Sequence, residues 1–226
     1  MSQNYDEIFF TAEDPGKGLM VTNKLDDGTW SEPKVANLRG NHSWEQEAFY
    51  TADGLMLYFA STDESGTNLW RSFKEKNGWS MAELLDSPVN NPNRVFWATF
   101  TQNHTMYYSN VDEFKTYRSE MVDDKYPRTE LAGIPFGLHA SVSKDESFII
   151  FNHRGDIYVA FRNTENKWGE PIKLEAPISS SEFGESCPCL SPDEKYIFFS
   201  RYNDTNDKSD IYWVSSSVLN KYEDGQ

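Results

Sequence analysis

The stretch that decides the fold runs from Cys187 to Arg201 and reads CPCLSPDEKYIFFSR. A short extended piece leads into a polar Ser-Pro-Asp turn, and a run of aromatic and branched residues follows. Short runs of this kind, bounded by turn residues, favour a strand over a helix, so the stretch predicts a β-hairpin. The same order returns in three other segments: Glu47–Ser61 (EAFYTADGLMLYFAS), Trp97–Asn110 (WATFTQNHTMYYSN) and His139–Asn152 (HASVSKDESFIIFN).

These segments form an internal repeat. The turn residues Asp53, Asn103, Asp145 and Asp193 lie 50, 42 and 48 positions apart, and a less regular fifth copy, Glu7–Asn23, opens the chain. A further strand pattern and a turn containing Trp follow most hairpins, which predicts a four-stranded antiparallel meander for each unit. After Val214 the last unit has no such Trp turn.

The middle strands of the units are expected to be buried on both faces, because their runs are apolar at both alternate positions. These runs are LMLYFA (Leu55–Ala60), FIIF (Phe148–Phe151) and YIFF (Tyr196–Phe199). An all-β chain with this period and doubly covered strands predicts a β-propeller, whereas a sandwich would not explain the period. Ser215–Tyr222 is predicted to be a short terminal helix with a serine cap.

Leu190–Ser200, with Asp210–Val214 behind it, resembles the Pro-Asp type, WD-like repeats of the TolB-like β-propellers, in which a Ser-Pro-Asp-Gly-Lys turn precedes an aromatic strand. Shorter forms of the motif occur at Thr51–Gly54, Thr101–Asn103 and Ser143–Asp145. The resemblance implies one all-β domain over residues 1–226, built of four-stranded antiparallel blades. Counting units predicts five blades, and six remain open because TolB relatives commonly have six. The family has varied roles, so the resemblance implies no single activity.

Composition and charge exclude some classes of binding partner. The chain holds 21 Lys and Arg against 36 Asp and Glu, a net charge of −15, without a run of three basic residues, so we expect no nucleic-acid partner. No stretch reaches the roughly 18 apolar residues of a membrane helix, and we expect no membrane insertion. The first twenty residues show no signal pattern, which leaves the compartment open: cytoplasmic as given, or periplasmic or exported if a signal was removed. We expect a monomer.

A candidate site lies where the chain enters each innermost strand, since a propeller points these positions at its central channel. The residues six positions before the turn residue are Glu47, Trp97, His139 and Cys187. The residues eight positions before it include two carboxylates, Glu45 and Glu185. A simpler interpretation is that these are solvated loop residues and a packed Trp. The predicted ligand-binding set is Glu45, Glu47, Arg94, Trp97, His139 and Glu185.

No catalytic or cofactor-binding motif is evident, so the leading hypothesis is a non-catalytic propeller that binds a protein, peptide or saccharide at its channel mouth, without a cofactor. The alternative is a carbohydrate-active hydrolase with Glu45 and Glu185 as the pair of carboxylates that glycosidases need. The four histidines show no metal-ligand spacing. The acidic segment Asn203–Asp210 could hold calcium, although a solvated loop is the simpler interpretation. The cysteines Cys187 and Cys189 are expected to be buried thiols.

Overall fold

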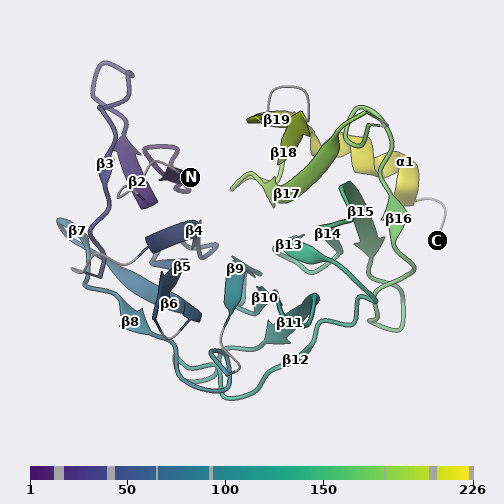
Figure 1. The fold of residues 1–226 in the computed structure, drawn as a ribbon, viewed down its shortest axis with the longest axis horizontal. Coiled ribbons are helices and arrows are strands. Elements are labelled where there is room, and N and C mark those ends of the chain that lie inside the picture. Colours follow the sequence, from purple (N-terminus) through teal and green to yellow (C-terminus); the bar gives the residue numbers. More distant parts are fainter. Residues whose placement is uncertain are drawn as a thin grey trace.

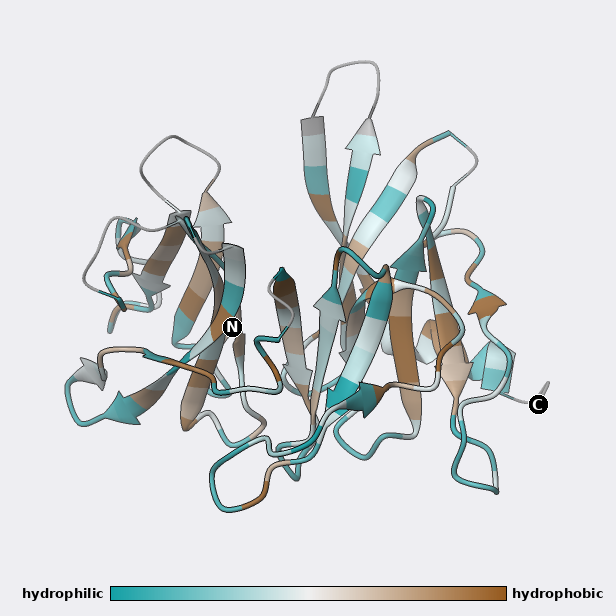
Figure 2. Cartoon of the chain, turned by 60° about the horizontal axis from the view of Figure 1, so that its bottom comes forward, coloured by the Kyte–Doolittle hydropathy of each residue, from teal (hydrophilic) through white to brown (hydrophobic). Residues whose placement is uncertain are grey.

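The chain forms five antiparallel sheets around a central axis (Figure 1) in a computed structural model, which describes residues 1–12, 18–39, 44–64, 66–91, 94–180, 182–203 and 208–223. This five-bladed β-propeller confirms the predicted fold class and the preferred blade count. Figure 2 shows apolar residues along the strands and hydrophilic residues along most connecting loops.

Blades one, three, four and five follow one order, with the first strand innermost. Blade one holds β1 (Glu7–Ala12), β2 (Gly18–Asn23) and β3 (Lys34–Val35). Blade three holds β9 (Val95–Phe100), β10 (Met106–Asn110), β11 (Lys115–Ser119) and β12 (Glu130–Leu131). Blade four holds β13 (Leu138–Val142), β14 (Phe148–His153), β15 (Asp156–Phe161) and β16 (Ile172–Lys173), and blade five holds β17 (Gly184–Leu190), β18 (Tyr196–Asn203) and β19 (Lys208–Ser215).

Blade two differs because its third strand pairs with two short strands. It holds β4 (Trp44–Tyr50), β5 (Met56–Asp63), β6 (Gly66–Glu75), β7 (Gly78–Trp79) and β8 (Glu83–Leu84), and both β7 and β8 pair with β6. After blade five, the 3₁₀ helix η1 (Ser216–Leu219) and the α-helical turn α1 (Asn220–Glu223) confirm the predicted terminal helix. The Ser215 hydroxyl accepts a hydrogen bond from the Ser217 N–H at 3.3 Å, as a serine cap does.

The repeated Ser/Thr-x-Asp turns explain why the hairpins recur. In blade five the Ser191 hydroxyl donates to Asp193 Oδ1 at 2.8 Å and accepts from the Tyr196 N–H at 3.0 Å. These bonds tie both sides of the turn together, and the Ser191 hydroxyl holds the pKa of the Asp193 carboxyl well below its usual range. Thr51 with Asp53, and Ser143 with Asp145, make the same bond at 2.6 and 3.0 Å.

The core consists of side-chain layers between successive blades. Four separate clusters of buried residues lie between them, with Leu19 and Phe59, Tyr58 and Tyr108, Tyr107 and Phe151, and Ile150 and Ile197 as members of the respective clusters. In blades two and four the middle strands β5 and β14 are buried on both faces, as predicted.

For blade five this prediction is only half right. Ile197 and Phe199 are buried against blade four, whereas Tyr196, on the opposite face of β18, keeps 39% of its surface exposed. The physical reason is that no further blade covers that face among the described residues.

The ring is open between its first and last blades (Figure 1). Packing runs without interruption through the inner strands from β1 to β17, but in the described part of the chain no comparable packing joins blade one to blade five. Within the described ranges, the two blades each hold three strands and do not complete one another by strand pairing. Residues before β1 bridge the opening at one end, where the Tyr5 hydroxyl interacts with the Asp193 carboxylate.

Candidate functional site

The inner strands of blades two to five share one backbone feature at the predicted site. In each, two residues oppose a single residue of the middle strand, which is a β-bulge. The first bulge residue is left-handed in all four blades, with φ between 50° and 55°: Glu47, Trp97, His139 and Cys187. The four equivalent positions that the repeat predicts as site residues therefore share one backbone conformation.

Three predicted site residues come together around this ring of bulges. The Trp97 ring lies 4.7 Å from the Phe49 ring and 4.9 Å from the His139 ring, both edge to face. His139 Nδ1 lies 2.7 Å from Asn152 Oδ1, and burial lowers the pKa of His139 despite that bond. The surroundings therefore favour the neutral form of the imidazole.

Glu47 is the least satisfied member of this group. Its Oε2 is buried without a hydrogen-bond partner in the described residues, and Trp97 Nε1 shares that condition. Burial raises the pKa of the Glu47 carboxyl to about 7, although a hydrogen bond from the Trp97 backbone partly offsets this. Burial also raises the pKa of Cys187 to about 11, and the nearby charge of Glu47 adds to this. The thiol is therefore an apolar neighbour at neutral pH rather than a nucleophile.

Glu45 and Glu185 have a different environment. Each carboxylate accepts a backbone N–H from the loop that enters its own blade, from Arg39 at 3.2 Å and from Ser180 at 3.1 Å. Glu185 also pairs with Arg201 Nε at 2.8 Å. Burial raises the pKa of Glu45 to about 7. Both carboxylates therefore make their hydrogen bonds within their own blades, and neither of them lines the central cavity.

Arg94 stands apart from the other predicted residues. Its Nη1 lies 2.6 Å from Asp112 Oδ1, and its side chain is 57% exposed. The structure therefore brings together Glu47, Trp97 and His139, and leaves Glu45, Glu185 and Arg94 in separate surroundings.

A cavity of about 1050 Å³ occupies the channel and the opening between blades one and five. Trp97 and Cys187 belong to its wall, and so do side chains that the sequence did not single out. The missed residues are mainly apolar and come from the terminal blades and from β4: Phe10, Phe49, Phe198, Tyr202 and Ile211. The sequence could not identify them, because aromatic and aliphatic residues of the same kind also fill the packing between blades.

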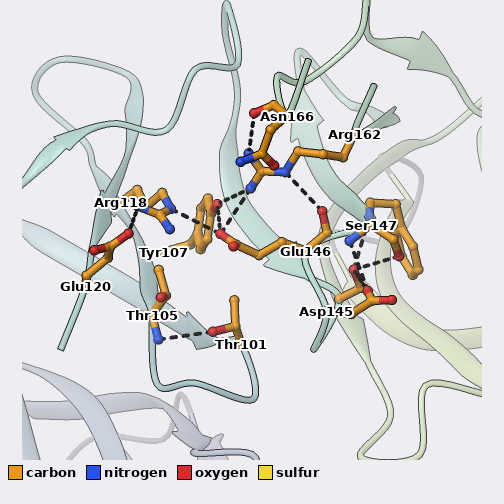
Figure 3. A network of polar contacts seen from close by, with 12 residues as sticks. Thr101, Thr105, Tyr107, Arg118, Glu120, Asp145, Glu146, Ser147, Arg162 and Asn166 are labelled. Carbon is orange, nitrogen blue, oxygen red and sulfur yellow. Dashed lines mark hydrogen bonds and ion pairs between the residues drawn. The ribbon is translucent and has the colours of Figure 1, made fainter. Parts of the chain in front are cut away.

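A second polar cluster joins blades three and four (Figure 3). Glu146 Oε1 accepts hydrogen bonds from the Tyr107 hydroxyl at 2.5 Å and from Arg118 Nε at 3.1 Å, and lies 3.1 Å from Arg162 Nη2. The Arg162 guanidinium stacks 4.0 Å above the Trp168 ring. All these charges have partners, so the cluster fastens two blades together and offers no free group to a ligand.

Metal binding has little support in the described residues. They contain no group of three His, Cys, Asp or Glu side chains arranged to hold a metal ion. Residues 204–207 of the candidate calcium segment lie outside the described residues. The described helices are also too short to cross a membrane.

Comparisons with known proteins identify the fold. No family model and no curated protein sequence matches the chain. Among solved structures, TolB from Acinetobacter baumannii is similar with a TM-score of 0.61 and 12% identity, over 94% of this chain and 50% of that one. The chain thus spans half the length of that TolB. Its fold is a β-propeller similar to that of TolB, as the sequence motif implied.

The same fold is found in proteins with other roles. A chain of the nidogen/laminin complex is similar with a TM-score of 0.58 and 7% identity, over 91% of this chain and 77% of that one. Regucalcin, a calcium-binding protein from Agrobacterium tumefaciens, has a TM-score of 0.51 and 11% identity, over 85% and 66%. At these identities the likeness establishes the fold alone.

Proposed function

We propose that the chain is a non-catalytic, TolB-like propeller that binds a protein or peptide partner through its central cavity and the adjoining channel mouth. The observation that carries this proposal is the large aromatic and aliphatic wall of the cavity. Its volume lies at the upper end of the roughly 300–1000 Å³ of small-molecule sites, and aromatic side chains are enriched in protein interfaces. A net charge of −15 disfavours nucleic acid.

The state of the candidate catalytic groups supports binding over hydrolysis. Glu45 and Glu185 accept hydrogen bonds within their own blades, and the Cys187 thiol is protonated at neutral pH. Trp97 and Glu47 remain, as an aromatic surface and a buried acid beside the channel. The occurrence of a similar propeller in the nidogen/laminin complex is consistent with a protein partner.

The test is a selection of displayed peptides on the immobilised protein, followed by anisotropy titrations of the selected peptide. Phe10 lines the cavity and is partly exposed, so Phe10→Asp is expected to weaken binding at least tenfold without loss of folding. The matched control is Phe114→Asp, at an exposed position outside the cavity lining. Equal affinity of both variants would contradict the proposal.

The hydrolase alternative is tested in parallel with chromogenic glycosides. Its supporting observation is the raised pKa of Glu45, about 7, which suits a proton donor. Turnover that Glu45→Gln abolishes would replace the binding proposal with the enzymatic one. Binding without turnover would support the propeller as a binding module.

A further inference from the structure

The third strands of blades four and five contain the same three residues. Asp156-Ile157-Tyr158 opens β15, and Asp210-Ile211-Tyr212 lies in β19. The registers coincide, because Tyr158 faces Phe151 of β14 and Tyr212 faces Phe199 of β18. The two tripeptides therefore occupy equivalent places in their blades.

In blade four an outer strand covers this tripeptide. Lys173 of β16 is opposite Tyr158, and its Nζ lies 2.8 Å from Asp156 Oδ2. The N–H of Leu174 donates to the carbonyl of Ile157 at 2.8 Å. Ile157 is completely buried, in a cluster that includes Leu174, which follows the outer strand, and Ile197 of blade five.

The backbone bond beside the outer strand recurs in the other blades. In blades one, two and three, the residue just after the outer strand donates its N–H to a carbonyl of the strand that pairs with it, and both residues are buried. The pairs are Ala36 to Leu19 at 2.8 Å, Leu85 to Leu69 at 3.1 Å and Ala132 to Thr116 at 2.9 Å. Docking of a short outer strand at this register is thus a general feature of the blades.

Blade five lacks that covering strand in the described part of the chain. There β19 pairs with β18 alone, leaving one edge open. Ile211 is 79% exposed and Trp213 is 64% exposed, on the face of the sheet that no further blade covers among the described residues. Asp210 is exposed, and among the described residues it has no counterpart of Lys173. An open apolar edge with a carboxylate at one end is a template for strand addition.

We propose that the outer edge of β19 docks an extended segment of a partner protein, which adds a fourth strand to blade five. The segment would carry a lysine for Asp210, followed by an aliphatic residue whose N–H donates to the Ile211 carbonyl. A second copy is disfavoured, because each copy carries a charge of −15 and two such chains repel each other. Ile211 also lines the central cavity. This proposal therefore rests on the proposed function, and it names the segment of the partner that lies beside the cavity.

The probe is a synthetic peptide, GEPIKLEAPI, which copies Gly169–Ile178 of this chain. It is titrated into the full chain while backbone amide shifts are followed by NMR. We expect millimolar binding, because an isolated peptide loses conformational entropy on pairing, and shifts concentrated at Ile211, Tyr212 and Trp213. Asp210→Lys is expected to weaken binding at least tenfold, whereas Asp86→Lys, the same charge change on an exposed loop of blade two, leaves it unchanged.

A charge exchange provides the second measurement. The peptide with glutamate in place of its lysine is expected to bind Asp210→Lys better than it binds the unmodified protein. No shifts in β19 at several millimolar peptide, or equal binding to Asp210→Lys, would overturn the proposal. Light scattering could instead show a dimer that is absent in Asp210→Lys. That result would also overturn the proposal, because it would assign the edge of β19 to a second copy. If the GEPIKLEAPI peptide does not bind at β19 but a selected peptide still binds in a Phe10-dependent way, strand addition at β19 is rejected and the proposed function is retained.

Discussion

The third strands of blades four and five contain the same Asp-Ile-Tyr sequence, but bury it to opposite extents. Ile157 is fully buried between the segment that follows its outer strand and blade five, whereas Ile211 is 79% exposed. The hairpin turns of the two blades are nearly superposable in their hydrogen bonding, with Ser143 and Asp145 matching Ser191 and Asp193. The repeat therefore determines each hairpin, and the neighbour in space determines whether its outer face is core or surface.

The largest expected effect separates the two isoleucines. Ile157→Ala should destabilise the protein by about 2–5 kcal/mol, because it removes methyl groups from a fully packed cluster. Ile211→Ala should change the free energy of unfolding by less than about 0.5 kcal/mol, since its side chain is already in solvent. Urea denaturation of both variants measures the difference. Similar losses would mean that β19 is covered in solution.

The turns should respond alike in both blades. Ser143→Ala and Ser191→Ala each remove the acceptor of a backbone N–H, from Phe148 and Tyr196, and should each cost about 1–3 kcal/mol. The measurement is again chemical denaturation. A silent Ser191→Ala beside a costly Ser143→Ala would show that the terminal hairpin contributes little to cooperative folding.

Glu47, at the bulge of an inner strand, should make the free energy of unfolding depend on pH, by an amount similar to or smaller than the effect of the turn substitutions. Because burial raises the folded-state pKa of Glu47 to about 7, the folded protein binds more protons than the unfolded chain between about pH 4.5 and 7. Stability should therefore fall as pH rises through this window.

Glu47→Gln should reduce that decline without abolishing it, because the pKa of Glu45 is also raised to about 7. At pH 8 the variant should be more stable than wild type by up to about 3 kcal/mol, since the pKa of Glu47 is raised from 4.5 to about 7 and one pKa unit corresponds to about 1.4 kcal/mol. Thermal unfolding between pH 4 and 8 tests both statements. A decline that persists unchanged in Glu47→Gln would place its origin in another group.

The smallest effect concerns the aspartates of the shared tripeptide. Lys173→Ala should lower the midpoint of chemical denaturation only slightly, because the Asp156–Lys173 pair is exposed to solvent. Asp210→Asn should leave the stability of the free protein unchanged within about 0.5 kcal/mol. Destabilisation by Asp210→Asn comparable to that by Lys173→Ala would reveal an ion pair at β19.

Much of the architecture could be predicted from particular residues. The Ser-Pro-Asp turn before YIFF places three side-chain acceptors and donors where a tight hairpin needs them, and this local chemistry repeats at a regular spacing. Counting such turns led to five blades. The helix after Ser215 was predictable for the same reason, since a cap is a local hydrogen bond.

The candidate site was predicted less completely. Alignment on the turns identified Glu47, Trp97 and His139, because a repeated bulge places them at equivalent points of the ring. It also selected Glu45 and Glu185, whose carboxylates accept hydrogen bonds from the loops entering their blades. Side-chain direction near a bulge depends on backbone geometry that residue spacing does not contain.

The strands, the turns and the number of repeats follow from the order of the residues, since they depend on contacts within about fifty residues. Three features follow from the packing of the blades instead: the ring is open, Phe10 and Ile211 line one cavity, and one copy of Asp-Ile-Tyr is core while the other is surface. The physical reason is that burial of a strand face depends on which blade packs against it, and residues far apart in the chain make that contact.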